Sequence, residues 1–122
     1  MSDSDPRHLF GHEAEERAAA FLTEQGYRIL ERNLRTRLGE VDIVAMDGDT
    51  LVFVEVRSRR DASAVHPAAT VNRRKQRQVV RVAMLYCQKH TVRDTMIRFD
   101  VVAVLGERGP IELIRNAFEA GR

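Results

Sequence analysis

Two acidic side chains interrupt two apolar segments of this sequence. Asp42 lies within the segment 39–47 and Glu55 within the segment 50–57, on either side of the turn 47–49. Burying a carboxylate among apolar side chains is costly unless a cation or hydrogen bonds satisfy it. A divalent metal is one such cation. The alternatives are that each acid pairs with a nearby arginine or a helix terminus, or faces solvent from a half-buried strand.

The turn Asp47-Gly48-Asp49 predicts that the two segments form a β-hairpin, because Gly and Asp tolerate the positive φ of tight turns. Successive side chains of a strand point to opposite faces. Within the first strand we expect Glu40, Asp42 and Val44 on one face and Val41, Ile43 and Ala45 on the other. Within the second strand we expect Phe53, Glu55 and Arg57 opposite Val52, Val54 and Val56. Two acids on paired strands, with Arg57 at the next position on the same face, favour the metal site.

The composition is that of an ordinary globular protein. The chain has 122 residues, of which 43% are hydrophobic and 31% charged, enough for one domain with one core. The first residues carry acid where a secretion signal needs base, and no apolar stretch is long enough to span a membrane. The single cysteine, Cys87, excludes an internal disulfide and a cysteine zinc site. We therefore expect a cytoplasmic protein without a membrane partner.

Positive charge is concentrated in one part of the chain. The net charge is only +2, but acids predominate up to Glu24 and bases predominate from 57 to 77. The bases of this block are Arg57, Arg59, Arg60, Arg73, Arg74, Lys75 and Arg77. Such a block suits a polyanion, because neutralised phosphates supply most of non-specific nucleic-acid affinity. An ordinary solvated surface is the alternative. Aromatic residues are few and scattered, which argues against a platform for stacking single strands.

The elements that would position these residues follow from the hydrophobic periodicity. It predicts an α/β domain of order α-β-β-β-α-β-β. The expected elements are a helix over 9–25, an outer strand over 27–34, the hairpin 39–57, a helix over 72–90 with Asn72 as N-cap, a central strand over 96–105 and a short last strand over 111–114. Residues 1–7 are expected to be a disordered tail and 58–70 a mobile loop. A helix between strands 50–57 and 96–105 predicts that they run parallel.

The helical periodicity predicts that three polar side chains face the interior. Glu15 falls inside the apolar arc of the first helix, either as a third acid near Asp42 and Glu55 or as a carboxylate paired with an arginine at the edge of the core. Lys75 and Gln76 begin the second helix on its inner side, where they can reach a site at the sheet. Extension of Lys75 outward into solvent is the alternative.

An acid, twelve intervening residues and then Glu-Val-Arg resembles the Asp…(Asp/Glu)-X-Lys signature of the PD-(D/E)XK nuclease superfamily. A wider set of motifs resembles the YraN family of small bacterial proteins. These motifs are Gly11-x-x-x-Glu15-x-x-Ala18, Gly26-Tyr27, Asn33, Gly39-Glu40-Val41-Asp42, Phe53-Val54-Glu55-Val56-Arg57, Lys75-Gln76 and Arg98-Phe99-Asp100-Val101-Val102. The resemblance covers the chain from Gly11 to Phe118.

The resemblance implies a restriction-endonuclease-like mixed β-sheet flanked by helices, related to archaeal Holliday-junction resolvases, in one domain over 1–122. It implies a metal-dependent, structure-selective DNA endonuclease with nucleic acid as its partner, and it leaves a homodimer open. Glu15, Asp42 and Glu55 would be carboxylates for Mg²⁺ or Mn²⁺. Asp42, Glu55, Arg57 and Lys75 would be catalytic. Arg57, Arg59, Arg60, Arg73, Arg74, Lys75, Gln76 and Arg77 would contact nucleic acid.

Arg57 departs from the superfamily signature, because it occupies the position of the signature lysine. An arginine stays protonated in proteins and cannot take a proton from water, although it can bind a phosphate with two hydrogen bonds. Either Lys75 takes over the role of the lysine, or the chain binds nucleic acid without cutting it. The fold that the resemblance implies is the same in both cases.

Overall fold

The computed structural model describes residues 6–59, 66–106 and 108–120. Its elements are α1 (Pro6–Glu24), β1 (Arg28–Thr36), β2 (Gly39–Asp47), β3 (Thr50–Arg59), the short 3-10 helix η2 (Pro67–Thr70), α2 (Arg73–Lys89), β4 (Met96–Leu105) and β5 (Ile111–Phe118). The expected order of helices and strands is confirmed. Asn72 is the N-cap of α2, and its side chain accepts a hydrogen bond from the Lys75 N–H.

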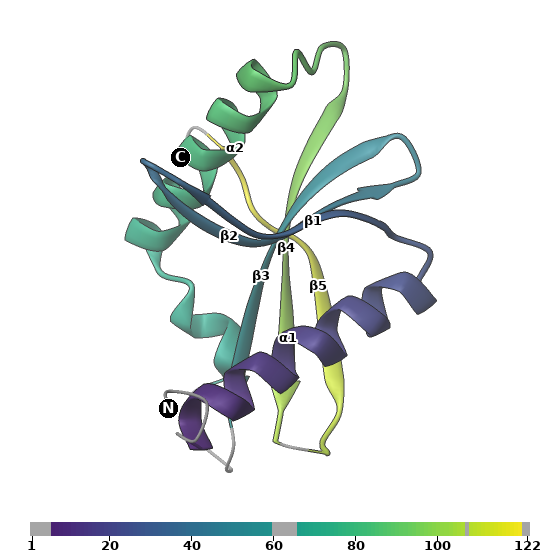
Figure 1. Ribbon diagram of the computed structural model, residues 1–122, viewed down its shortest axis with the longest axis vertical. Helices are drawn as coiled ribbons and strands as arrows, with labels where there is room; N and C mark the ends of the chain where they lie inside the picture. The colour runs from purple at the N-terminus through teal and green to yellow at the C-terminus, as the bar shows by residue number, and fades with distance from the viewer. Residues whose placement is uncertain (1–5, 60–65, 107, 121–122) are drawn as a thin grey trace.

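The five strands form one mixed sheet in the order β1-β2-β3-β4-β5. β1 lies at an edge, as the polar side chains of its segment predict. β3 and β4 run parallel, as α2 between them predicts, and every other pair is antiparallel. The sheet is strongly twisted, and α1 and α2 cover its two faces (Figure 1).

Two apolar clusters, one on each face, form the core. On the α1 face, Ala14, Ala18 and Leu22 pack against Ile43, Val54 and Val102. On the α2 face, Val79, Val82 and Tyr86 pack against Val44, Phe53 and Phe99. The alternation predicted for β3 is confirmed, because Phe53 and Val54 lie in different clusters. Cys87 is half-buried beside the α2 cluster, where burial raises the pKa of its thiol.

The alternation predicted for β2 is wrong at its beginning. Val41 lies in the α2 cluster together with Val44, whereas Ile43 and Ala45 lie in the α1 cluster. β2 remains paired with β1 as far as Gly39, but its pairing with β3 extends only from Asp47–Thr50 to Ile43–Val54. Beyond that pair β2 and β3 separate, and we call this opening the fork (Figure 1). The change of face occurs at Asp42, the first residue within the fork.

Three further boundaries differ from expectation. α1 begins at Pro6, and residues 1–5 of the expected tail lie outside the described part. The expected mobile loop contains the end of β3 and the 3-10 helix η2, and its residues 60–65 lie outside the described part. At the N-cap of η2, His66 Nδ1 accepts a hydrogen bond from the Ala68 N–H. β5 continues to Phe118 rather than ending at Ile114. The ring of Phe118 is buried and stacks on Phe99, so packing extends the strand.

A buried polar network on the α1 face connects β2 and β4 with Tyr27, the residue before β1. The Asp100 side chain is 0% exposed and accepts hydrogen bonds from the Tyr27 hydroxyl and from the Arg98 guanidinium. Arg98 also donates to Asp47 at the end of β2, over 2.8 Å. Because a buried carboxylate is costly without partners, this network fixes the mutual position of these strands.

Candidate active site

Glu55 lies at the centre of the site. Its side chain is 1% exposed on the α2 face of β3. Two cations approach its Oε1, Lys75 Nζ at 3.5 Å and Arg57 Nη2 at 3.6 Å. The N-cap at Asn72 sets the first turn of α2 so that Lys75 points inward, which confirms its expected position on the inner side of the helix.

Asp42 faces Glu55 across the fork. The Val56 N–H donates to Asp42 Oδ2 over 2.7 Å, and the Asp42 N–H donates to Glu55 Oε2 over 3.3 Å. The two carboxylates thus satisfy backbone donors of β2 and β3 at the point where these strands no longer pair. The fork therefore brings the two acids together and places both beside Lys75 and Arg57.

Burial of these acids changes their proton affinity. Burial raises the pKa of Glu55 to about 7, and the charge of Asp42 adds to the rise, whereas Lys75 and Arg57 oppose it. Burial also raises the pKa of Asp42, against the hydrogen bond from Val56 and the nearby cations. A pair of acids with raised pKa values in a cleft is typical of functional sites.

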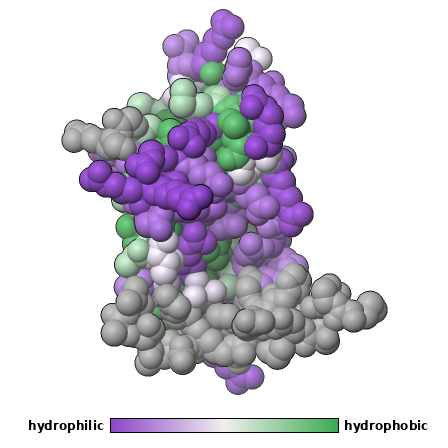
Figure 2. Space-filling view, turned by 90° about the vertical axis from the view of Figure 1, so that its left-hand side faces the viewer, coloured by the Kyte–Doolittle hydropathy of each residue, from purple (hydrophilic) through white to green (hydrophobic). Residues whose placement is uncertain are grey.

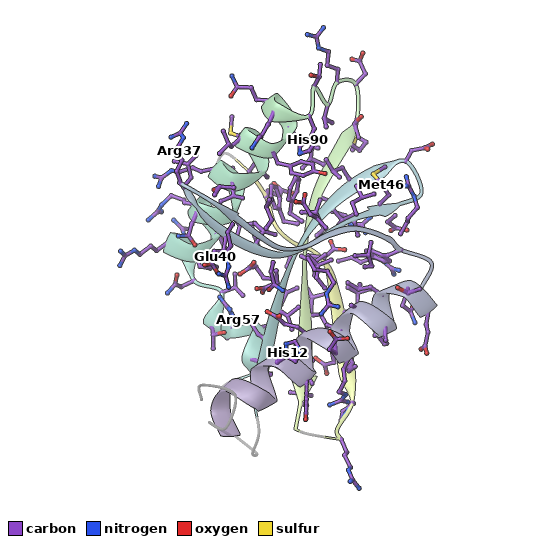
Figure 3. All side chains as sticks on the ribbon, in the orientation of Figure 1. His12, Arg37, Glu40, Met46, Arg57 and His90 are labelled. Atoms are coloured by element: carbon purple, nitrogen blue, oxygen red, sulfur yellow. The ribbon has the colours of Figure 1, made fainter. Side chains whose placement is uncertain are left out.

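Glu15 reaches the same cleft from α1. A cavity of about 500 Å³ opens between α1 and the fork, and its lining includes Glu15, Asp42, Arg57 and His12. Burial raises the pKa of Glu15, and the second cause is the negative charge of Asp42. Figure 3 shows Glu40, Arg57 and His12 along this side of the molecule, between the β1–β2 turn and α1. Within the described residues no three acids, histidines or cysteines converge closely enough to hold a metal by themselves.

Arg57 carries an unsatisfied donor beside these acids. Its Nε atom is buried and has no hydrogen-bond partner among the described residues. A buried guanidinium nitrogen without an acceptor is costly, and an anionic ligand in the cleft would satisfy it. The structure thus brings together the four predicted catalytic positions, Asp42, Glu55, Arg57 and Lys75, and brings Glu15 to the same cleft.

Gln78 positions Lys75 through a hydrogen bond, a role that the sequence does not reveal. Lys75 Nζ donates to Gln78 Oε1 over 2.9 Å. The Gln78 side chain lies so close to the backbone of Gly39 that a Cβ on Gly39 would approach it to 2.6 Å. Gly39 also has a φ of +139°. The spacing of the acids and the lysine in the sequence gives no signal for Gln78, since a glutamine within a helix is ordinary.

Apart from Arg57 and Lys75, which lie beside Glu55, the residues predicted to contact nucleic acid separate into three groups. Arg73, Arg74 and Arg77 are exposed on the outer side of α2. Gln76 instead donates to the Val71 carbonyl and secures the start of the helix. The Arg59 side chain and Arg60 lie outside the described residues. Figure 2 shows a predominantly hydrophilic surface on the side of the molecule that α2 and the β1–β2 turn occupy in Figure 1.

Arg35 is a cation near the site that lies outside the basic block found in the sequence. It lies in the edge strand β1 and lines the cavity together with Asp42 and Arg57. Its guanidinium is 3.8 Å from the Glu40 carboxylate, a solvent-exposed pair. No helix of the described chain is long and apolar enough to cross a membrane.

Comparison with known proteins identifies relatives along nearly the full chain. A family model described as uncharacterised protein family UPF0102 matches residues 14–104. A UPF0102 protein of Desulfosudis oleivorans is 44% identical over 93% of this chain and 93% of its own length. A UPF0102 protein of Caldicellulosiruptor saccharolyticus is 46% identical over 88% of this chain and 95% of its own length. One of Anaeromyxobacter dehalogenans is 52% identical over 96% of this chain and 89% of its own length. The chain therefore belongs to the UPF0102 family, as its resemblance to YraN proteins predicted.

Proposed function

We propose that this protein is a metal-dependent, structure-selective DNA endonuclease of the PD-(D/E)XK type. The observation that carries the proposal is the convergence of Asp42 and Glu55 at the fork with Lys75 beside them. Two acids and one cation at the end of paired strands are the residue types that phosphodiester hydrolysis needs. The two faces of the sheet contribute jointly, since Lys75 comes from α2 and Glu15 from α1.

The donor set fits Mg²⁺ or Mn²⁺. Both ions prefer oxygen ligands, and Mg²⁺ is usually held by one or two carboxylates together with water and phosphate oxygens. Asp42 and Glu55 would hold the ion, and Glu15 lines the same cavity as Asp42. When bound, the metal would lower the pKa of a water and neutralise charge on the phosphodiester. Its charge would also lower the pKa of Glu55 and relieve the repulsion between the two carboxylates.

The chain's own cations serve the phosphate. The unsatisfied Arg57 Nε is a donor for a phosphate oxygen in the cleft. Lys75, held by Gln78 and Glu55, supplies a second positive charge where negative charge develops during hydrolysis. In this proposal Arg57 binds the phosphate, and Lys75 takes the role of the signature lysine. The basic outer side of α2 supplies contacts to the backbone of the substrate.

A non-catalytic nucleic-acid-binding protein is the second candidate. The observation in its favour is that Asp42 Oδ2 and Glu55 Oε2 already accept backbone N–H groups of the separated strands. Carboxylates engaged in this way can simply stabilise the fork. This candidate and the first agree on binding and differ on cleavage.

A cleavage assay separates the two candidates. Purified protein is incubated with duplex, flap, junction and single-stranded DNA in Mg²⁺, in Mn²⁺ or in EDTA. We expect cleavage that needs metal and that Asp42→Asn, Glu55→Gln and Lys75→Met abolish, whereas Arg57→Lys retains it. Glu24→Gln, at the exposed end of α1, is the matched control and should cut like the wild type. Binding without cleavage of any substrate would establish the second candidate.

A further inference from the structure

A second cleft lies on the opposite face of the β1–β2 hairpin. It is a groove of about 700 Å³ between β1 and the C-terminal half of α2. Arg35, Arg37, Lys89 and His90 line it together with one acid, Glu31. Leu34, Leu85 and Tyr86 contribute apolar surface. The groove thus combines an apolar floor with a cationic rim.

Arg35 connects this groove with the candidate active site. It lines both the groove and the cavity that contains Asp42 and Arg57. β1 is an edge strand, so a ligand can pass around it from one cleft to the other. Figure 3 shows Arg37 at the tip of the hairpin, with Glu40 and Arg57 to one side of it and His90 farther along α2 on the other.

The groove also contains two aromatic rings in tilted contact. The rings of Tyr86 and His90 lie 4.1 Å apart with an angle of 31° between their planes, and His90 is exposed. An exposed ring on an apolar floor can stack a nucleobase, and cations at the rim can bind the phosphates on either side of it. A duplex hides its bases, so this chemistry suits unpaired nucleotides rather than paired ones.

We infer that this groove binds a short unpaired segment of nucleic acid that continues from the strand held in the candidate active site. The β1–β2 hairpin then separates the two parts of a branched substrate, with the strand to be cut in the cavity lined by Asp42 and Arg57 and the unpaired arm in the groove between β1 and α2. This inference rests on the proposed function and specifies its substrate as DNA with an unpaired arm beside a duplex.

Binding titrations in EDTA test the inference without requiring cleavage. The probes are a blunt duplex and the same duplex with a short unpaired overhang of either polarity, labelled for fluorescence anisotropy. We expect the wild type to bind one overhang probe about 10-fold more tightly than the blunt duplex. The double variant Arg37→Ala/Lys89→Ala should bind all probes alike. For the overhang probe, its slope of log K against log salt concentration should fall by about 1.4, because each single-strand phosphate contact contributes roughly 0.7.

Two controls complete the experiment. The double variant Arg28→Ala/Arg93→Ala removes the same charge from exposed positions that line neither cleft, and it should keep the overhang preference. A 2-aminopurine base in the overhang should lose fluorescence on binding to the wild type and to His90→Phe, but not to His90→Ala. If the wild type binds the blunt and overhang probes equally, the inference is overturned and the proposed function stands. If no probe binds, the inference is overturned, and the cleavage assay in Mg²⁺ decides the proposed function separately.

Discussion

At the scale of single residues, the charge on Asp42 makes ionisation of Glu55 harder. Two like charges a few ångströms apart repel by roughly 3 kcal/mol at an effective dielectric constant of about 20, and Arg57 and Lys75 offset only part of this. A bound cation would remove the remainder. We therefore expect the free energy of unfolding to depend on whether a cation occupies the site.

Replacement of Asp42 tests this dependence. In Asp42→Asn the amide oxygen can still accept the hydrogen bond from Val56, while the negative charge is lost. In EDTA we expect the variant to be more stable by about 1 kcal/mol, or roughly 3 to 6 °C in melting temperature. Mg²⁺ at about 100 times its dissociation constant should stabilise the wild type by about 2.7 kcal/mol and the variant far less. Thermal melts of both proteins, each with EDTA and with Mg²⁺, measure the two effects. A variant that melts below the wild type in EDTA, with no response to Mg²⁺ in either protein, would show that Asp42 only stabilises the fork.

The raised pKa of Glu55 makes the metal-free protein sensitive to pH. Glu55 ionises near its ordinary value of 4.5 in the unfolded chain and at about 7 in the folded one. Between these values the folded state holds a proton that the unfolded state has lost. The free energy of unfolding is therefore highest below pH 4.5 as far as Glu55 is concerned. It falls as the pH rises to 7, by up to about 1.4 kcal/mol per pH unit.

Melting curves in EDTA across this pH range measure the loss. We expect the melting temperature of the wild type to fall from pH 5 to pH 8 relative to that of Glu55→Gln, which has no carboxyl group to ionise. The fall should be smaller in Asp42→Asn, where one cause of the raised pKa is absent. Glu24→Gln should follow the wild type. Parallel curves for the wild type and Glu55→Gln would contradict the raised pKa.

At the scale of elements, the position of Lys75 depends on how closely α2 approaches the beginning of β2. Gln78 lies against Gly39 and accepts a hydrogen bond from Lys75, so the contact between these elements fixes the lysine beside Glu55. A Cβ at position 39 would displace the end of the Gln78 side chain, so glycine at this position keeps Gln78 beside Lys75. Gln78 thus acts as a positioning residue.

A double-mutant cycle measures this contact. Gly39→Ala should destabilise the protein by about 1 to 3 kcal/mol, from the clash and from the φ of +139°. In a Gln78→Ala background the clash is gone and part of the cost should be recovered, with a coupling of about 0.5 to 3 kcal/mol. Gly26→Ala is the control, since φ there is +94° and a Cβ would meet no atom within 4 Å. It should be destabilising without coupling to Gln78, and equal coupling at both glycines would contradict the proposed contact.

The elements and the site differ in how far the sequence predicts them. The order of strands and helices follows from periodicity and from Asn72 as a cap, and the parallel pairing of β3 with β4 follows from the helix between them. The fork does not follow, because the hydrogen bonds of Asp42 and Glu55 to backbone N–H groups replace the pairing that alternation assumes. Gln78 and Arg35 remained unrecognised because their roles arise from contacts between elements distant in sequence.

At the scale of the whole molecule, a net charge of only +2 conceals a strong separation of charge. Acids of the site lie within the fork, while Arg73, Arg74 and Arg77 are exposed on the outer side of α2. These three arginines follow directly on the N-cap of the helix that carries Lys75. Under the proposed function, a nucleic acid that approached the carboxylates along α2 would meet this basic surface, whose positive charge would offset the negative charge of the site.

The salt dependence of duplex binding tests the basic surface of α2. Each phosphate contact contributes roughly 0.9 to the slope of log K against log salt concentration. The double variant Arg73→Ala/Arg74→Ala should lower the slope by about 1 to 2, with little effect on the melting temperature because both side chains are exposed. Arg28→Ala/Arg93→Ala removes the same charge away from α2 and should leave the slope nearly unchanged. An equal change in both double variants would mean that net charge alone governs binding. An unchanged slope in Arg73→Ala/Arg74→Ala would mean that this face of α2 is only solvated, and that the substrate approaches the carboxylates from the side of α1.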